Sequence, residues 1–230
     1  KEPIKMTWSD ADILSASKEI KTRFVKCYDA SKVVIYLSLY QGSARRMLYE
    51  YPDTFANKAE AKRIQEILFE SLGAKLRKWQ NETMRLAQKQ HFLINQFGYK
   101  HFFYDVLTRD LKKGWKLGTQ ANEALAFLPQ STAAAIIKEA IRRIASYPFY
   151  RQAMRWVIHD SLLFELPKSN FEERLPFIGK SMSYAIPQLG GLLIETECKV
   201  GENWGEMAKR EEPALHAYYR EVETLRKIAL

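Results

Sequence analysis

A lysine stands in an otherwise apolar and aromatic stretch, where residues 28–43 read YDASKVVIYLSLYQGS. In a helix, four residues advance by about 400°, which puts Tyr28, Tyr36 and Tyr40 on the same ridge as Lys32. A core stripe would explain the tyrosines but not the lysine, because a buried ammonium is costly without a counter-charge. Either Lys32 reaches water along its own stem, or the ridge faces a cleft that receives an anion. Tyrosines beside that anion would suit a ligand with both a flat base and phosphates.

A second candidate is His159-Asp160-Ser161, which stands between two apolar runs in RWVIHDSLLFELP, residues 155–167. This pattern predicts a strand, a tight turn and a second strand. Two roles are open for Asp160: an Asx-turn residue that bonds its own backbone, or a ligand of Mg²⁺ at a strand end. Glu165 follows at an odd spacing, which places it on the opposite face and predicts a basic partner.

A third candidate is Gln130, which precedes an alanine-rich segment in LPQSTAAAIIKEAIRRIASYP, residues 128–148. Small residues let another surface approach closely, and an amide can meet the acceptors that every base pair presents in the minor groove. Ser131 or Thr132 is expected to cap a helix over 131–147 that ends at Pro148.

The elements that must position these residues are mostly helical by apolar spacing. One helix over 58–90, which Gly73 could interrupt, carries a basic face that is either a solvated surface or a track facing phosphates. A β-hairpin or bent ribbon is expected at 92–106, and a polar loop at 108–120. The remaining expected elements are helices starting at Ser9-Asp10 and over 28–41, 171–186 and from 203 onward, and a strand at 192–199.

Composition limits the function classes. Of 230 residues, 47% are hydrophobic and 27% charged, which is enough for a buried core and excludes a disordered chain. Lys and Arg number 36 against 27 Asp and Glu, which favours an anionic partner. Cys27 and Cys198 do not suggest a disulfide framework, and no apolar run reaches the ~20 residues of a membrane span. The chain begins at Lys1 without a signal-like segment, so we expect it to start inside a longer gene product.

Several motifs occur in one order along the chain: Lys-x-x-x-Tyr-x-x-x-Tyr-Gln-Gly at 32–42, Pro-Gln-Ser-Thr-Ala-Ala at 129–134 and Val-Ile-His-Asp at 157–160. This order resembles the C-terminal part of family A DNA polymerases. Glu-x-Lys-x-Gly-x-Asn-Trp at 197–204 is similar to the chain ends of phage members, and DILSAS at 12–17 looks like a stretch that follows their first catalytic motif. The resemblance covers nearly the whole chain.

The resemblance implies an α+β fold, predominantly helical, with polymerase fingers helices and part of an antiparallel palm sheet. Residues 1–120 would form the fingers, with the fingers helix at 28–41 and the hairpin at 92–106. Residues 121–230 would form the C-terminal portion of the palm with the His-Asp turn.

The resemblance also implies roles in the transfer of a nucleotide from a dNTP to a primer 3′-hydroxyl. Lys32 would contact the phosphates of the incoming dNTP and assist the leaving pyrophosphate. Tyr36 would stack near its sugar and base, and Tyr40 would guard the templating position.

On the palm side, Gln130 and His159 would lie against the primer-template DNA, and Asp160 would ligate Mg²⁺ in a two-metal site. The first catalytic motif, which carries a further metal ligand, is absent from this sequence. That ligand is therefore expected upstream of Lys1 or on a complementing chain, and we expect this chain alone to bind DNA weakly at most and to be inactive in polymerisation. A cytoplasmic location in a bacterial or phage-infected cell, with no membrane contact, is expected.

The sequence departs from the family pattern at three motif positions. Tyr28 stands where an arginine is usual, so that a phosphate contact would come from elsewhere, with Arg23 and Lys26 as candidates. Gln41 displaces a glycine, and Ser161 replaces an acidic residue.

Two alternatives remain open. A single-subunit RNA polymerase would share the fold and the lysine, but those enzymes usually carry methionine at the position of Tyr36. A non-catalytic, helical nucleic-acid-binding module would explain the three departures.

Overall fold

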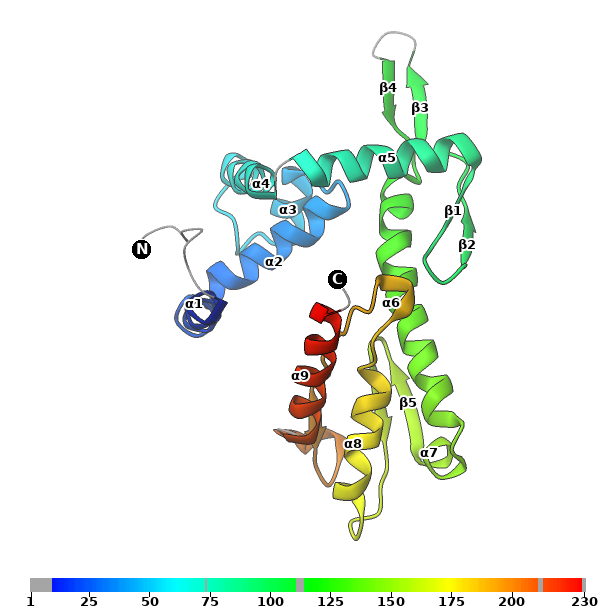
Figure 1. Cartoon of the computed structure of the whole chain (residues 1–230). Helices are drawn as coiled ribbons and strands as arrows, with labels where there is room; N and C mark the ends of the chain where they lie inside the picture. The colour runs from blue at the N-terminus through cyan, green and yellow to red at the C-terminus, as the bar shows by residue number, and fades with distance from the viewer. Residues whose placement is uncertain (1–9, 73, 111–113, 211–212, 229–230) are drawn as a thin grey trace. The chain divides into compact units, whose positions relative to one another are not determined.

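The chain folds into two compact units, and each is described by itself. The computed structural model describes residues 10–72, 74–110, 114–210 and 213–228 (Figure 1). The first unit comprises Lys1–Leu93 and His101–Phe127, and the second comprises Ile94–Lys100 and Leu128–Leu230.

Helices make up most of the first unit, because its apolar residues recur every three or four positions. The predicted helix over 58–90 is two helices, and Gly73 between them lies outside the described residues, as does Ser9 before the first helix. The helices are α1 (Asp10–Arg23), α2 (Val25–Leu39), α3 (Ala44–Glu50), α4 (Lys58–Leu72) and α5 (Ala74–Gln90).

The core of this unit holds α2 in place from one side. Val34 on α2 packs in a cluster with Met47 on α3, with Ala61 on α4 and with Phe55, which lies between those two helices. Amide side chains bind the end of α2: Gln80 Nε2 donates to the carbonyl oxygens of Ser38 and Leu39 at 2.8 and 3.0 Å, and Gln65 Nε2 donates to the carbonyl oxygen of Gly42 at 2.7 Å. Buried carbonyl groups need such donors. Because the core and these hydrogen bonds fix α2, the side chains on its opposite face point in a defined direction.

The prediction of a polar loop at 108–120 is wrong. Strands β3 (Leu107–Asp110) and β4 (Gly114–Leu117) form an antiparallel hairpin there, and β3 contacts α5 (Figure 1). Alternation over such short strands is a weak signal, and the two lysines and the glycine at 112–114 favoured a loop.

Three further elements contain residues of both units: β1 (Phe92–Ile94), β2 (Lys100–Phe102) and α6 (Ala121–Ala145). β1 and β2 pair within the region predicted as a hairpin. The prediction that Ser131 or Thr132 caps a helix is wrong, because α6 begins at Ala121 and continues through Pro129. Proline removes one backbone donor, but Ala121, Ala124 and Leu125 are buried on one face and outweigh that loss.

The second unit is a mixture of helices and short hairpins. Residues 155–167 contain a strand, a turn and a strand, as predicted. The helix predicted from 203 onward begins only at Pro213, because a 3-10 turn and a short strand occupy most of residues 204–210. The elements are α7 (Pro148–Ala153), β5 (Met154–Ile158), β6 (Ser161–Phe164), α8 (Phe171–Met182), η1 (Pro187–Leu189), β7 (Cys198–Val200), η2 (Trp204–Glu206), β8 (Ala208–Arg210) and α9 (Pro213–Ile228).

Two other boundaries in this unit differ from prediction. The helix expected over 171–186 ends at Met182, and of the strand expected over 192–199 only its last two residues belong to β7. The buried hydroxyls explain the difference: Ser183 Oγ donates to the carbonyl oxygen of Ile194 at 2.8 Å, and Tyr219 OH lies 3.2 Å from both Ser183 Oγ and Thr196 Oγ1. The Ser183 hydroxyl thus gives the Ile194 carbonyl a side-chain partner in place of a strand ladder.

The predicted fold class is confirmed: the chain is α+β and predominantly helical, with small antiparallel sheets. Within the described residues, no helix combines the length and apolar character that crossing a membrane requires.

Candidate functional site

The ridge on α2 faces away from the core of the first unit. Lys32 is exposed and Tyr36 is 62% exposed, whereas Val34, on another face of the helix, is 2% exposed. Tyr28 and Tyr40, at the two ends of the ridge, are partly buried. The tyrosines are therefore not a core stripe, and Lys32 stands on an accessible surface.

Two lysines lie near the ring of Tyr28, the residue at the position of the expected arginine. Lys32 Nζ is 4.3 Å from the ring centroid and Lys21 Nζ, from α1, is 5.8 Å from it. Of the two candidates from sequence, Arg23 is paired with Glu19 at 2.9 Å and Lys26 is exposed. Lys21 was not predicted, because its proximity depends on how α1 packs against α2, which spacing along the chain does not reveal.

The other end of the ridge is the partly buried phenol of Tyr40. Burial, and to a smaller extent the neighbouring Tyr36, raises the pKa of Tyr40. Like any tyrosine hydroxyl at neutral pH, that of Tyr40 is an uncharged hydrogen-bond donor and acceptor. A positive group at Lys32 and neutral aromatic groups at positions 36 and 40 are chemically suited to a ligand with phosphates at one end and a ring at the other.

The departure at Gln41 has a structural basis. The amide of Gly42 donates to the carbonyl oxygen of Leu37 at 2.6 Å and the amide of Gln41 donates to that of Ser38 at 3.3 Å. This pair of bonds closes α2 as a Schellman motif, whose left-handed residue is usually glycine. Gln41 takes that position with φ 61°, and Gly42 fits against the last turn because a Cβ there would lie 2.8 Å from Leu37 Cβ.

The His159-Asp160 turn projects from the β5–β6 hairpin of the second unit. Ile158 and Ser161 are paired, so that the turn has two residues, and His159 has a φ of 52°. A positive φ at the first residue is typical of the primed turns that two-residue hairpin loops favour. Both His159 and Asp160 are exposed, and the side-chain hydrogen bond recorded at this turn is Ser161 Oγ donating to Ile158 O at 2.9 Å.

Glu165 has the basic partner that its spacing predicted. Arg155 Nε donates to Glu165 Oε2 at 2.8 Å, on a pair of exposed side chains. The prediction is confirmed, and it leaves Asp160 as the carboxylate at the turn.

A cavity of about 890 Å³ lies beside Asp160. Strand β6, helix α8 and the segment 196–202 line it, mostly with apolar side chains such as Leu162 and Ile178. An ion pair of 2.6 Å between Lys168 and Glu202 stands among its lining residues.

Asp160 supplies one oxygen ligand of the kind that Mg²⁺ prefers, on an exposed turn. Across the residues that the structure describes, no group of three or more His, Cys, Asp or Glu side chains is arranged to hold a metal. These residues therefore fit a part of a magnesium site.

Gln130 is exposed on α6, beside a loop that is fastened to the same helix. Asn95, which is buried, donates from Nδ2 to Ser131 Oγ at 2.9 Å, and Thr132 Oγ1 donates to Gln96 Oε1 at 3.1 Å. Asn95 Oδ1 also accepts from backbone amides within its own turn. Gln130 thus belongs to the second unit with His159 and Asp160, whereas the ridge on α2 belongs to the first.

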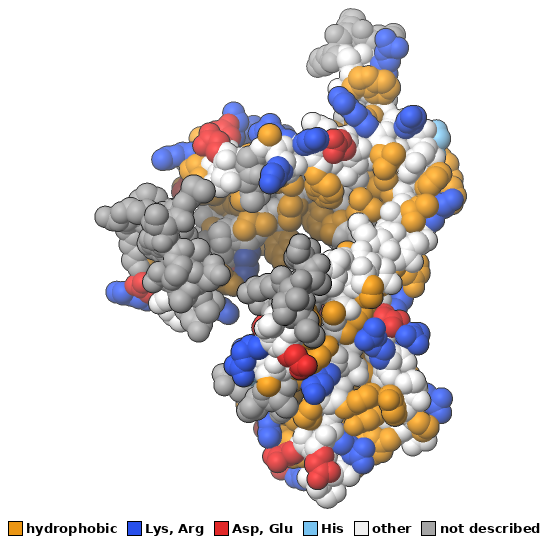
Figure 2. Space-filling view, viewed as in Figure 1, with side chains coloured by type: hydrophobic (Ala, Val, Ile, Leu, Met, Phe, Trp, Pro, Cys, Tyr) orange, Lys and Arg blue, Asp and Glu red, His pale blue; other side chains and the backbone are white. Residues whose placement is uncertain are grey.

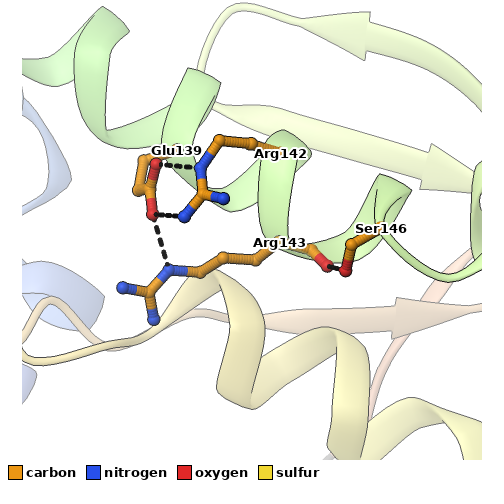
Figure 3. Close-up of polar contacts among 4 residues, drawn as sticks. All are labelled: Glu139, Arg142, Arg143 and Ser146. Carbon is orange, nitrogen blue, oxygen red and sulfur yellow. Dashed lines mark hydrogen bonds and ion pairs between the residues drawn. The ribbon is translucent and has the colours of Figure 1, made fainter.

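Charged side chains farther along α6 form hydrogen-bonded ion pairs with one another. Glu139 accepts from Arg142 Nε and Nη2 at 2.7 Å and from Arg143 Nε at 3.0 Å (Figure 3). These bonds, Arg142 first, lower the pKa of Glu139 to about 2 against the opposing effect of burial. The Arg143 guanidinium also lies 3.8 Å from the ring centroid of Tyr184, whose pKa is raised by burial. These contacts indicate a structural role for the charged side chains at this end of α6.

The basic face of α4 and α5 is in part a solvated helix surface. Figure 2 shows Lys and Arg side chains on these helices with acidic side chains among them. Lys62 and Lys78 each have an acidic neighbour one turn away, at 3.4 and 3.8 Å, and Arg77 stacks 4.4 Å from the ring centroid of Phe69. For these three residues a solvated helix surface is the adequate description.

Comparison with known proteins identifies one family for this chain. A family model described as DNA polymerase family A matches residues 19–206. A thermostable DNA polymerase I from Thermus filiformis is 28% identical over 182 residues, which are 77% of this chain and 20% of that polymerase. The chain thus spans about a fifth of the length of this curated relative.

A solved structure has a similar fold. The POL domain of Pol1 from M. smegmatis, in complex with DNA primer-template and dNTP, superposes with a TM-score of 0.56 at 20% identity. The match covers 67% of this chain and 27% of that one.

Proposed function

Because the chain belongs to DNA polymerase family A, we propose that it forms the fingers and the C-terminal palm portion of a DNA-directed DNA polymerase. Its reaction would be template-directed transfer of a nucleotide from a dNTP to a primer 3′-hydroxyl. The observation that carries this proposal is the exposed ridge of α2, where Lys32 lies between Tyr28 and Tyr36 on the side away from the core.

Lys32 is proposed to bind the phosphates of the incoming dNTP. An ammonium on an accessible helix face can approach a triphosphate and stabilise the charge that develops on the leaving pyrophosphate. Lys21, the second cation near the Tyr28 ring, is proposed to supply the phosphate contact that the missing arginine would make. Both lysines are exposed, which such a contact requires.

Tyr36 and Tyr40 are proposed to contact the sugar and bases. Tyr36 offers a largely exposed ring one turn beyond Lys32, which suits stacking near the sugar and base of the dNTP. Tyr40, neutral and partly buried at the end of the helix, is proposed to lie at the templating position.

In the second unit, Gln130 and His159 are proposed to bind the primer-template and Asp160 to hold Mg²⁺. Bound metal would align the primer 3′-hydroxyl with the α-phosphate and stabilise the developing charge. The role of Asp160 is to present its carboxylate from a two-residue turn whose direction is set by the positive φ of His159.

A further segment is proposed to complete the site. It would come from an upstream part of the same polymerase or from a complementing chain, and it would carry the remaining metal ligand. The cavity beside Asp160 supports this idea, since mostly apolar side chains of β6, α8 and the segment 196–202 line it. Such a cavity can take up apolar side chains of another segment. We propose that the 230-residue chain alone is inactive and that it works in the cytoplasm.

The first test restores the upstream coding segment and measures extension of a primed template with dNTPs and Mg²⁺. Asp160→Asn is expected to reduce extension by at least a hundredfold (~3 kcal/mol of barrier). Glu165→Gln is the matched control, because it neutralises another exposed carboxylate on the same hairpin, and it should extend at close to the wild-type rate. Equal extension by wild type and Asp160→Asn would refute the role of Asp160.

The same assay separates the alternatives. A non-catalytic nucleic-acid-binding module would extend nothing in either form, and a single-subunit RNA polymerase would incorporate ribonucleotides in preference to dNTPs. Primer extension by the purified 230-residue chain would refute the need for an added segment.

The second test measures binding of a fluorescent dNTP analogue to the first unit within the intact chain. Lys32→Ala is expected to weaken binding about tenfold, and Lys62→Ala, an exposed lysine on α4, is expected to leave it unchanged. Equal losses in the two variants would point to general charge attraction and contradict a specific site at Lys32.

A further inference from the structure

The β3–β4 hairpin presents an aromatic and basic face that the proposed reaction does not use. In its register Leu107 pairs with Leu117 and Arg109 pairs with Trp115. Directly opposed residues and residues two apart share one face of a hairpin, so these four side chains lie together. Trp115 is 66% exposed and Leu117 46% exposed, and Arg109 is exposed as well.

The base of this hairpin is firmly held. Asp105 Oδ2 accepts from the amide and hydroxyl of Thr119 at 2.8 and 2.7 Å, and Asp105 Oδ1 accepts from Thr108 Oγ1 at 2.7 Å. These bonds, from the Thr119 amide first, lower the pKa of Asp105 to about 2. Gln88 on α5 also accepts from the amides of Val106 and Leu107 at 3.3 and 2.8 Å. The exposed face is therefore presented on an anchored ribbon.

An exposed tryptophan on an anchored ribbon calls for a partner. Tryptophan buries more apolar area than most side chains, and leaving one largely in water forgoes that gain. In sequence, residues 107–118 carry Arg109, Lys112, Lys113 and Lys116 against a single acidic residue, Asp110. Basic and hydrophobic side chains are visible on this hairpin in Figure 2. The partner that fits this charge is an anion with flat, apolar surfaces.

We propose that the Arg109–Trp115 face of the β3–β4 hairpin binds single-stranded nucleic acid. A base stacks on the indole of Trp115, and Arg109, directly opposite in the register, binds an adjacent phosphate. A single strand is favoured over a duplex because its bases can be splayed out to reach an aromatic ring. This inference rests on the proposed function only in that a DNA polymerase handles a single-stranded template.

The first experiment measures binding of a fluorescein-labelled oligothymidylate to the intact chain at low salt by anisotropy. Trp115→Ala is expected to weaken binding roughly five- to hundredfold, the range of one stacked base, and Trp115→Phe should recover most of it. Trp204→Ala is the matched control, since Trp204 is 60% exposed but lies in η2 of the second unit.

Arginine and lysine on the two faces of the ribbon supply a second comparison. Arg109→Ala is expected to weaken binding and to lower the slope of log affinity against log salt by about one. Lys116 lies on the other face, paired with Asp110 at 4.0 Å, so that Lys116→Ala should have the smaller effect.

Photocrosslinking locates the contact directly. An oligonucleotide with 5-bromodeoxyuridine should crosslink to the peptide that contains Trp115, and the crosslink should be lost in Trp115→Ala. An unchanged affinity in Trp115→Ala, or equal losses in Trp115→Ala and Trp204→Ala, overturns the proposal and leaves the face to a protein partner.

The outcomes are separable from those of the catalytic test. Oligonucleotide binding requires neither metal nor catalysis, so Asp160→Asn should bind the oligothymidylate as wild type does. If Asp160→Asn extends primers normally while Trp115→Ala loses binding, the proposed role of Asp160 fails and the hairpin proposal stands.

Discussion

Substitutions at two adjacent residues at the end of α2 should change the stability of the helix end in opposite directions. Gln41 holds a φ of 61° at the left-handed position of the Schellman motif, and Gly42 packs against the last turn of the helix. Replacing Gln41 with glycine removes the steric cost of the left-handed conformation. Replacing Gly42 with alanine adds a Cβ that would lie 2.8 Å from both Leu37 Cβ and Leu37 O.

The expected magnitudes follow from these contacts. A non-glycine residue in the left-handed region costs roughly 1–2 kcal/mol, and glycine loses about 0.5–1 kcal/mol more backbone entropy on folding. Gln41→Gly should therefore stabilise this helix end by up to about 1 kcal/mol. Gly42→Ala should destabilise it by about 1–3 kcal/mol, which is the usual cost of overpacking. Moving residue 42 to relieve the overlap would also strain the 2.7 Å hydrogen bond that Gln65 Nε2 donates to its carbonyl oxygen.

Amide hydrogen exchange is the suitable assay, because a chain with two compact units need not unfold in one transition. Exchange of the Gly42 amide should slow up to about fivefold in Gln41→Gly, and exchange of the residue 42 amide should speed up five- to hundredfold in Gly42→Ala. Faster exchange in Gln41→Gly, or unchanged exchange in Gly42→Ala, would refute the assignment of the strained position to Gln41.

Three further predictions concern other described contacts. Asp105→Asn should reduce the loss of stability that acid causes between about pH 4 and about pH 2. A carboxyl whose pKa in the folded protein is about 2 stabilises the fold fully above its unfolded pKa, and that stabilisation is lost as the pH falls. Denaturation midpoints of both proteins at pH 7 and pH 2.5 test this, and an equal change of midpoint between the two pH values in wild type and variant would contradict it. His159→Gly should raise the stability of the β5–β6 hairpin by up to about 1 kcal/mol while lowering primer extension by the restored polymerase, and a loss of stability in melting experiments would count against strain at this φ of 52°. Gly179→Ala should lower the melting temperature at a cost of about 1–3 kcal/mol, because its Cβ would overlap the side chain of Leu215 on α9, and an unchanged melt would show that Leu215 moves aside.

The local features of the candidate site could be predicted from spacing alone. The ridge on α2 follows from the helical period, and the cost of burying an ammonium correctly placed Lys32 on an accessible face. The His159-Asp160 turn follows from the two apolar runs that flank it, and a basic partner for Glu165 follows from the period of a strand, although Arg155 itself was identified only in the structure. Both periods are properties of the backbone that sequence neighbours impose on one another.

Features that depend on distant packing could not be predicted in this way. The start of α6 at Ala121 was missed because a proline argues against a helix locally, while the burial of Leu125 argues for it only in the folded chain. The β3–β4 hairpin was missed because its anchor is Gln88, which lies well before it in the sequence. The end of α8 was misplaced because Ser183 bonds to Ile194.

The sequence by itself determined the family of this chain, the period of its helices and the residue types at the candidate site. The tertiary structure alone decided that Lys21 lies near Tyr28, that Gln41 takes the left-handed position and that Trp115 and Arg109 share an exposed face. The physical reason is that residue order sets which side chains share a face of one element. Which elements meet depends on the burial of apolar surface and of polar groups summed over the whole chain.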